Sequence, residues 1–406
     1  MRKTFTGIIV AVNTPETYNI KTEVIELKEL AESINIEVLG THVQNRSKED
    51  RRYYVGSGFL DEVRGMYEDI DYVIVNDEIL ASQNRNIETL FDASVIDRTQ
   101  VILDIFSQRA ESREGKLQVE LAQLNYLVPR LRGQGINLSR LGAGIGTRGP
   151  GETKLETDRR HIGERIKELK RQLKTIEKHR ESYRADRNKT LVTKFSLIGY
   201  TNAGKSAMFN TLTEGGTLEE NKLFATLDPK TRKLEFNTGF QALLTDTVGF
   251  IQKLPTMLVE SFKSTLEEAA DSDFLIHIID NSSEDIVSQY RTVKELIEEL
   301  QMSDIPQVVF FNKSDLDDTR KFIPDELYTY TNIFMDPLDI KETLVSLIEA
   351  HYEYYERTLQ VSQTNELYDL KRDTYVAKET FDEENLVYEI KGYVKNLNIV
   401  KRILKE

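Results

Sequence analysis

The chain contains no cysteine among its 406 residues and has five histidines. The absence of cysteine excludes disulfide scaffolds, thiolate zinc sites and cysteine nucleophiles. The histidines lie far apart, without the spacing of metal ligands, and are interpreted as ordinary surface or core residues: His42, His161, His179, His277 and His351. Any metal site in this protein is therefore expected to use oxygen ligands.

Long apolar runs are also missing. No segment approaches the roughly 20 apolar residues that span a bilayer, and the start, MRKTFTGIIVAVNTP, has too short an apolar stretch for a signal peptide. Hydrophobic residues make up 39% and charged residues 30%, without low-complexity tracts, which is typical of a globular chain with a sizeable core. We therefore expect a cytoplasmic protein of two to four domains that begins with a β-strand.

Net charge is unevenly distributed along the sequence. The whole chain carries −14, which argues against a nucleic-acid partner. The segment 109–189, however, has 20 basic and 11 acidic residues, a local balance of +9, and the remainder carries −23. Such asymmetry indicates an interaction segment between acidic domains.

The first hundred residues alternate β-type runs with helical patterns. GIIVAVN, IEVLGTHV, DYVIVN and VILDIF are expected as strands, and TEVIELKELAESI and GFLDEVRGMYE as helices. This alternation predicts a parallel α/β domain over 1–108. Gly56 and Gly58 open a helix, as a phosphate-binding turn or as an ordinary tight turn.

The basic segment predicts an antiparallel helical hairpin over 109–192. The first helix, from about Glu111 to Val128 with Pro129 as its end, has an apolar seam at Leu117, Leu121, Leu124 and Val128. The second, from about Glu152 to Arg187, has a seam at Ile162, Ile166, Leu169, Leu173 and Ile176. Both seams have the 4, 3, 4 spacing of helices that pack against each other. Seven of the 21 glycines lie between the helices, within residues 133–151, and indicate a pliable basic loop.

A second α/β domain is predicted over 193–352. Its expected strands are FSLIGY, KLEF, ALLTDT, DFLIHIID and QVVFFNKSD. A small α+β domain follows over 353–406, with HYEYYERTL at its start interpreted as helical and LVYEIKGYV as a strand.

A phosphate-binding loop follows the first of these strands. The segment from Gly199 to Ser206, GYTNAGKS, fits GxxxxGK[ST] and stands between a strand and a helical pattern, as the motif requires. Backbone N–H groups and a helix N-terminus would surround phosphate oxygens. Lys205 would contact the β- and γ-phosphates and Ser206 would bind Mg²⁺. This loop alone leaves ATP and GTP equally possible.

Three further elements complete the nucleotide site. Asn312-Lys313-Ser314-Asp315 ends a strand at the ligand-binding edge of the sheet, and it favours guanine because the Asp315 carboxylate can accept from N1–H and the 2-amino group together. Asp246 ends another strand, so it can act on Mg²⁺ through water, while the Gly249 N–H meets the γ-phosphate. Thr226 in LFATLDP is the expected switch threonine, a Mg²⁺ ligand when triphosphate is bound.

Taken together, these segments resemble the HflX family of ribosome-associated GTPases. The resemblance covers nearly the whole length and rests on GYTNAGKS, FATLDP, DTVGFI and NKSD, with DRTQVILDIFSQRAESREGKLQVELAQL and GAGIGTRGPGETKLETDRRHI upstream. It implies an N-terminal α/β domain, a helical linker, a Ras-like G domain and a small C-terminal domain. It also implies a cytoplasmic Mg²⁺-dependent GTPase that binds the large ribosomal subunit and helps to split ribosomes. We expect a monomer without a membrane partner.

The expected contacts fall into two groups. Nucleotide contacts are expected from Gly199, Tyr200, Thr201, Asn202, Ala203, Gly204, Lys205, Ser206, Phe224, Ala225, Thr226, Leu227, Asp228, Asp246, Thr247, Val248, Gly249, Asn312, Lys313, Ser314 and Asp315. Ser206, Thr226 and Asp246 form the expected metal set. Ribosomal RNA contacts are expected from the glycine-rich tip and four arginines, Arg140, Arg148, Arg159 and Arg160.

The sequence departs from the family pattern at two places. Ala207 replaces the threonine of GKST, and Phe334-Met335 stands where a Ser-Ala pair normally helps to hold guanine. Guanine affinity or exchange is therefore expected to differ. These departures keep a second hypothesis open, a nucleotide-gated RNA-binding scaffold with little hydrolysis.

Hydrolysis is expected to be slow without the ribosome. Phe250 follows Gly249 where Ras-like enzymes place a water-orienting glutamine, and phenylalanine cannot position water. Asn202 offers one compensation, since its amide could hold K⁺ against the phosphates; alternatively it only braces its own loop. The physiological trigger, and whether the N-terminal domain binds a second nucleotide, stay open.

Overall fold

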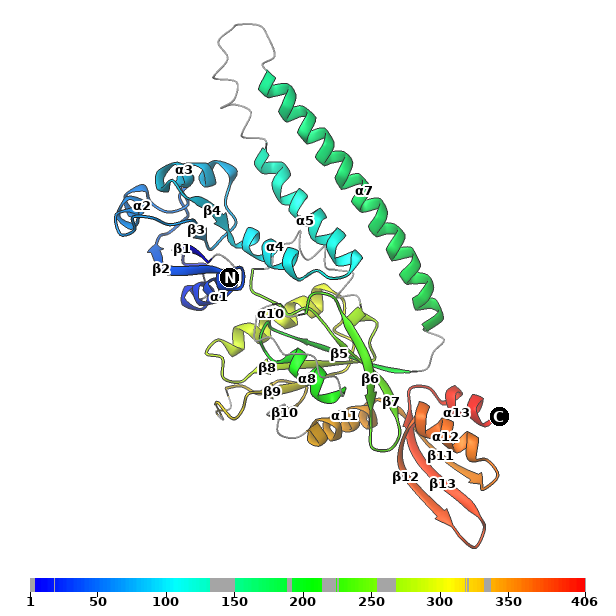
Figure 1. The fold of residues 1–406 in the computed structure, drawn as a ribbon. Helices are drawn as coiled ribbons and strands as arrows, with labels where there is room; N and C mark the ends of the chain where they lie inside the picture. Colours follow the sequence, from blue (N-terminus) through cyan, green and yellow to red (C-terminus); the bar gives the residue numbers. More distant parts are fainter. Residues whose placement is uncertain are drawn as a thin grey trace. The chain divides into compact units, whose positions relative to one another are not determined.

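The computed structural model describes residues 4–17, 19–131, 150–187, 192–213, 224, 226–253, 268–317, 319, 321–331 and 337–405, with the backbone alone at 131, 150–158 and 179–187. The chain divides into two compact units, Met1–Glu177 with Gln252–Phe262, and Lys178–Ile251 with Lys263–Glu406. Each unit is described by itself (Figure 1). No helix among these described residues is long and apolar enough to cross a membrane.

The first unit contains a four-stranded parallel sheet. Its strands, in the spatial order β2-β1-β3-β4, are β1 (Phe5–Asn13), β2 (Ile36–Asn45), β3 (Tyr72–Val75) and β4 (Ser94–Asp97). The helices between and after them are α1 (Ile20–Ser33), α2 (Ser57–Arg64), α3 (Ala81–Phe91) and α4 (Arg98–Arg109). The run from Ile8 to Val12 is buried throughout because helices cover both faces of a parallel sheet. The predicted parallel α/β domain is confirmed.

The segment VILDIF is helical, so its prediction as a strand is wrong. It lies inside α4, which begins where the Asp97 side chain accepts a hydrogen bond of 2.9 Å from Gln100 N. Val101, Leu103 and Phe106 are fully buried or nearly so. A helix buried on most sides gives a continuous apolar run, which sequence periodicity cannot distinguish from a buried strand.

A two-helix hairpin of α5 (Arg113–Leu131) and α7 (Pro150–Arg187) follows (Figure 1). Its seam contains the predicted apolar residues Leu117, Leu121, Leu124, Ile166, Leu169, Leu173 and Ile176. Arg165 forms hydrogen bonds of 2.6 and 2.7 Å to the two carboxylate oxygens of Glu120 across the pair. The 38 residues of α7 give a length of about 57 Å.

Pro129 lies within α5, so its predicted role as the helix end is wrong. Proline has no backbone N–H, so the helical hydrogen bond that position 129 would donate to Asn125 O is missing, and the helix includes the proline all the same. The Arg130 guanidinium donates to Tyr126 O at 3.0 Å, and it also donates to Asp97 Oδ2 at 2.8 Å. A side chain thus satisfies a carbonyl near the end of the helix.

Gly56 precedes α2 with an ordinary extended backbone. A Cβ at this position would lie 2.9 Å from Arg46 Nη1. This atom is the far end of a flexible side chain, so the contact alone does not require glycine at this turn.

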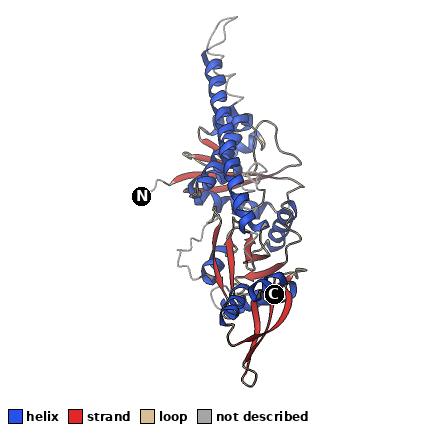
Figure 2. Ribbon diagram, turned by 90° about the vertical axis from the view of Figure 1, so that its right-hand side faces the viewer, coloured by secondary structure: helices blue, strands red, loops and turns tan. Residues whose placement is uncertain are grey.

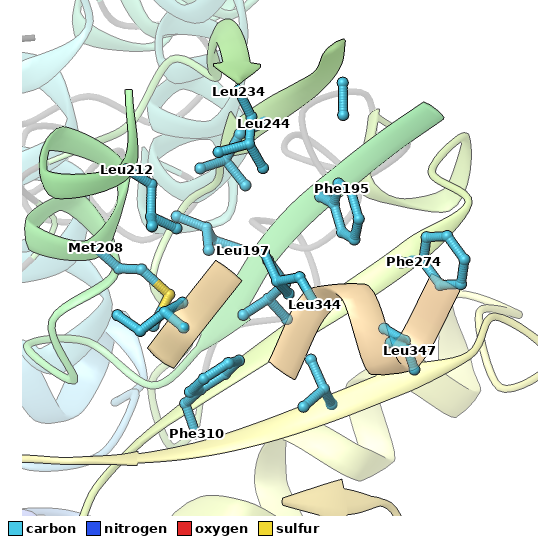
Figure 3. Packing of buried hydrophobic residues seen from close by; sticks show 14 of the residues in the cluster. Phe195, Leu197, Met208, Leu212, Leu234, Leu244, Phe274, Phe310, Leu344 and Leu347 are labelled. Atoms are coloured by element: carbon cyan, nitrogen blue, oxygen red, sulfur yellow. The ribbon is translucent and has the colours of Figure 1, made fainter. Parts of the chain in front are cut away.

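The second unit contains a six-stranded sheet in the order β10-β9-β8-β5-β7-β6. Its strands are β5 (Thr193–Gly199), β6 (Lys230–Glu235), β7 (Gln241–Asp246), β8 (Phe274–Asp280), β9 (Gln307–Asn312) and β10 (Leu327–Tyr330), and only β6 pairs antiparallel. The helices described around this sheet are α8 (Lys205–Leu212), α10 (Ile286–Glu299) and α11 (Pro337–His351). Figure 3 shows Phe195, Met208 and Leu344 in the core that links this sheet to α8 and α11. The carboxyl ends of the parallel strands form one edge, where the motifs lie.

A small α+β region ends the chain (Figure 2). Its antiparallel sheet, ordered β11-β13-β12, consists of β11 (Glu353–Gln360), β12 (Tyr375–Asp382) and β13 (Val387–Val394), with helices α12 (Thr364–Asp373) and α13 (Leu397–Leu404). The segment HYEYYERTL is mostly strand β11 rather than helix. Tyr355 and Leu359 are buried between exposed neighbours, which is the two-residue period of a half-buried strand.

Candidate active site

The phosphate-binding loop connects β5 to α8. Gly199 and Gly204 have φ values of 147° and 103°, which favour glycine. A Cβ at Gly199 would also lie 2.2 Å from Ile278 O on β8, so this position has no room for any side chain. Gly204 is the N-cap of α8, and the N-terminus of this helix therefore faces the loop.

Lys205 lies inside this loop. Its ammonium donates to Gly199 O at 3.1 Å and to Tyr200 O at 2.7 Å, and the residue is 6% exposed. Burial lowers the pKa of Lys205 to about 8, although the Asp246 carboxylate acts in the opposite direction. Burial thus disfavours the charged form of Lys205, and an anionic partner favours it.

The three expected metal ligands lie together. Ser206 Oγ lies 2.8 Å from Asp246 Oδ2 and 3.0 Å from Thr226 Oγ1, and Thr226 donates to the same Asp246 oxygen at 2.7 Å. Asp246 is fully buried, and its Oδ1 has no hydrogen-bond partner in the part of the chain described. Burial raises the pKa of Asp246, while Thr226, Lys205 and Ser206 counteract this rise. Two hydroxyls and a carboxylate with an unused oxygen fit Mg²⁺, which prefers oxygen ligands.

The segment after β7 closes against the phosphate-binding loop. Thr201 N donates to Phe250 O at 2.7 Å, and Phe250 N donates to Gly199 O at 3.1 Å. A Cβ at Gly249 would lie 2.9 Å from Thr201 Cγ2 and 3.0 Å from Lys205 Nζ. Gly249 is therefore required by close approach, and its backbone lies beside the lysine that would contact phosphate.

The Phe250 side chain belongs to a hydrophobic cluster. It is 2% exposed and packs among residues that include Ile198 and Val293. The ring is thus used for packing and supplies no polar group to water.

The NKSD segment meets the phosphate-binding loop. Asn312 Nδ2 donates to Ala203 O at 2.9 Å, and Lys313 Nζ donates to Asn202 O at 3.1 Å. Asp315 is exposed at the end of this segment. The residues expected to contact the base therefore bind the loop expected to hold the phosphates.

Asp280 lies beside the NKSD segment, although no predicted motif includes it. It ends β8 beside Asn312 of β9, and its carboxylate binds Lys313 Nζ at 2.7 Å. Its position at the carboxyl end of DFLIHIID was the available signal, since that end lies on the ligand-binding edge.

The remaining expected positions differ in burial. Phe224 and Leu227 are buried beside Thr226, and Ala207 packs against the core of the second unit. Arg159 and Arg160 are exposed on α7. The predicted contacts at Ala225, Arg140 and Arg148 lie outside the described residues, as do Phe334 and Met335, which stand in place of the family's Ser-Ala pair.

The chain matches three family models in succession. Residues 21–107 match a model described as GTP-binding GTPase N-terminal, 109–187 match GTP-binding GTPase Middle Region, and 194–313 match 50S ribosome-binding GTPase. These models correspond to the N-terminal sheet, the helical hairpin and the sheet that carries the phosphate-binding loop.

Relatives of similar length match nearly the whole chain. The GTPase HflX of Alkalihalophilus pseudofirmus is 46% identical over 96% of this chain and 95% of its own length, and that of Caldanaerobacter subterraneus is 44% identical over 95% and 89%. A crystal structure of a GTP-binding protein from Sulfolobus solfataricus in complex with GDP is 22% identical, covers 84% of this chain and 98% of that one, and has a TM-score of 0.45. With this identity over nearly the whole length, and with a P-loop GTP-binding domain, the chain belongs to the HflX family of GTPases.

Proposed function

We propose that this GTPase requires Mg²⁺, binds the large ribosomal subunit and promotes the splitting or recycling of ribosomes. The observation that carries the Mg²⁺ requirement is the cluster of Ser206, Thr226 and Asp246 oxygens within 3.0 Å of one another. The ribosome as partner is supported by kinship with HflX proteins and by the description of the model that matches 194–313.

The residues divide the work of hydrolysis. Lys205 and the loop N–H groups hold the phosphates, and Asn312, Lys313 and Asp315 hold guanine. The bound metal supplies charge stabilisation on the phosphate oxygens. Thr226, through the metal, and the Gly249 N–H, through the γ-phosphate, are the groups that distinguish GTP from GDP in this proposal.

Hydrolysis without the ribosome is slow in this proposal. Phe250 is buried, so the water-orienting group comes from elsewhere. Asn202 is exposed in the loop with φ of 61°, and its amide oxygen is the proposed K⁺ ligand. GTP turnover is measured for the parent and for Asn202→Ala, each in K⁺ and in Na⁺. If all four rates are equal, K⁺ has no role, and the rest of the proposal is unaffected.

The hairpin provides the contact with ribosomal RNA. Arg159 and Arg160 are exposed on α7, and the glycine-rich segment before them carries Arg140 and Arg148. Arginine contacts with phosphates release counterions, so binding weakens with salt. Replacing Arg140 and Arg148 by alanine should weaken co-sedimentation with large subunits and flatten its salt dependence. An unchanged slope would leave this segment a spacer.

The proposed organisation is a cytoplasmic monomer with domains at 1–108, 109–192, 193–352 and 353–406. Its location follows from the ribosome as partner. Limited proteolysis should cut near these boundaries first, and sedimentation equilibrium should give the mass of one chain.

GTP turnover with and without large subunits tests the function directly. We expect slow turnover alone and strong acceleration by large subunits, abolished by Lys205→Ala. Ala207 packs against the hydrophobic core of the second unit. The absence of the threonine hydroxyl at this position therefore gives little support to the alternative of a nucleotide-gated scaffold with little hydrolysis. Ribosome binding that depends on nucleotide without any stimulated turnover would favour that scaffold instead.

A further inference from the structure

The Lys313 ammonium lies between two segments of the second unit. It donates to Asn202 O in the phosphate-binding loop at 3.1 Å and to Asp280 Oδ2 at the end of β8 at 2.7 Å. The side chain of Lys313 is 28% exposed and that of Asp280 is 18% exposed. Lys313 therefore connects the carboxyl end of β8 to the loop expected to hold the phosphates.

The backbone of Lys313 has a conformation that lysine seldom adopts. Its φ is 58°, in the left-handed region, and Asn202, whose carbonyl accepts from Lys313, has a φ of 61°. Residues other than glycine keep this conformation only where the surrounding structure holds them in it. The two hydrogen bonds of the Lys313 ammonium provide such a constraint.

The Asp280 carboxylate is itself held in one orientation. Its Oδ1 accepts from Ser282 N at 2.9 Å and from Ser282 Oγ at 2.6 Å, while Oδ2 accepts from Lys313. Asp280 pairs with Asn312 in the register of β8 and β9, so it lies at the same sheet edge as the NKSD segment. The two carboxylate oxygens thus have separate partners, one within their own turn and one on the neighbouring segment.

The residue after Asp280 supports the NKSD segment independently. Asn281 is fully buried, and its N donates to Asn312 O at 2.9 Å. Its side-chain nitrogen donates to Asp317 O, beyond the motif. These bonds do not involve the Asp280 carboxylate. A change of that carboxylate is therefore expected to act on Lys313 rather than on the fold of the segment.

The stem of Lys313 is the part of this side chain that a purine ring can contact. Its methylene groups form an apolar stem with many rotamers, and fixing one rotamer costs entropy. Acceptors in two different segments, Asn202 O and Asp280 Oδ2, fix the stem before a nucleotide binds. Less entropy is then lost on binding, which is the general effect of preorganisation.

We propose that Asp280 is a positioning residue for guanine nucleotides, which acts by holding the stem of Lys313 against the face of the base. The stem contacts the ring face and not its polar edge. Asp280 therefore sets the affinity for the nucleotide, whereas Asp315 sets the choice of base. The inference rests on the proposed role of the NKSD segment in holding guanine.

Asp280→Asn tests the proposal with little change in side-chain shape. The asparagine oxygen can still accept from Ser282, but its NH₂ group turns donors toward the Lys313 ammonium. GDP affinity, measured by isothermal titration calorimetry, should fall about three- to tenfold. Inosine diphosphate lacks the 2-amino group but has the same ring face, so its affinity should fall by the same factor. The matched control is Glu326→Gln, since Glu326 binds Lys294 with a side chain 15% exposed, and no change is expected.

A double-mutant cycle separates positioning from a general effect on the fold. In Lys313→Met the ammonium is absent, so the further change Asp280→Asn should lower GDP affinity by less than about twofold. A purely structural role of Asp280 would give the same loss in both backgrounds. Thermal unfolding without nucleotide checks that each variant is folded, and Asp280→Ala repeats the cycle where the asparagine variant is not.

The outcomes distinguish this inference from the proposed function. An unchanged GDP affinity in Asp280→Asn would overturn the role of Asp280. A loss for GDP without a loss for inosine diphosphate, or an equal loss in the Lys313→Met background, would also overturn it. A parent that binds neither GDP nor a GTP analogue would instead remove the proposed function.

Discussion

Thr226 Oγ1 donates a hydrogen bond of 2.7 Å to Asp246 Oδ2, although the two residues are 20 positions apart on different segments. Ser206 Oγ binds the same carboxylate oxygen at 2.8 Å. The expected switch threonine therefore lies on the proposed metal-binding carboxylate. Its hydroxyl can exchange this bond for a metal when GTP binds.

Thr226→Ala should weaken binding of a GTP analogue in Mg²⁺ by about tenfold or more, since hydrogen bonds and contacts to charged groups contribute about 1.5 to 3 kcal/mol. GDP affinity should stay within about twofold, because the role of Thr226 requires the third phosphate. Isothermal titration calorimetry measures both. Thr226→Ser keeps the hydroxyl and should behave like the parent; equal losses for GDP and the analogue would contradict a switch role.

Asp315→Asn should reverse guanine selectivity. An amide places a donor opposite N1–H or the 2-amino group, and each mispaired group costs about 1 to 3 kcal/mol. GTP affinity should fall tenfold or more while xanthosine triphosphate gains, as measured by competition binding. The matched control is Asp317→Asn, because the Asp317 carboxylate is bound locally by Thr319 and Lys321.

GDP affinity should fall as pH rises past the pKa of Lys205. Burial lowers this pKa to about 8 in the protein without nucleotide, and phosphate contact raises it, so binding takes up a proton above pH 8. The loss should reach about tenfold between about pH 7 and pH 9. In the unfolded chain Lys205 has its ordinary pKa, so above about pH 8 the unfolded chain binds more protons than the folded one. The contribution of Lys205 to the free energy of unfolding therefore rises with pH until that ordinary pKa is reached.

Lys205→Arg provides the comparison for this pH profile. Its guanidinium stays charged across the range, so this variant should bind more weakly and without the fall above pH 8. Parallel profiles for the two proteins would contradict the assignment of the titration to Lys205.

The nucleotide site could be anticipated because its residues lie in short contiguous segments at strand ends. The seams of α5 and α7 were readable for a similar reason, since a 4, 3, 4 spacing needs no knowledge of distant residues. VILDIF was predicted as a strand because a helix buried on most sides shows no helical period. HYEYYERTL was predicted as a helix because its clustered tyrosines hide the two-residue period of a strand.

Contacts between distant residues had no local signal. Lys253 binds Glu23 from 230 positions away, and Arg130 binds Asp97 across 33 positions. Arg130 follows Pro129, which residue preferences alone place at the helix end, and its side chain contacts the end of β4. These pairings depend on the packed sheet edge, which only the folded chain defines.

Leu169→Ala should loosen both helices of the hairpin. Leu169 is fully buried in the seam with Leu117 and Leu121, and removing such a side chain costs about 2 to 5 kcal/mol. Alanine favours helix, so the loss would come from packing rather than from the backbone. Amide hydrogen exchange should quicken in α5 and α7 together, because each helix buries its apolar seam against the other.

Two nearby variants make this test specific. Lys170→Ala alters an exposed neighbour on the same helix and should leave exchange unchanged. Arg165→Ala breaks the exposed pair with Glu120 and should affect exchange much less than Leu169→Ala, because water and salt screen an exposed ion pair. If amide exchange in Leu169→Ala becomes faster in α7 but not in α5, the apolar seam does not stabilise the hairpin. The proposed RNA-contact arginines on α7 would then lack a rigid support.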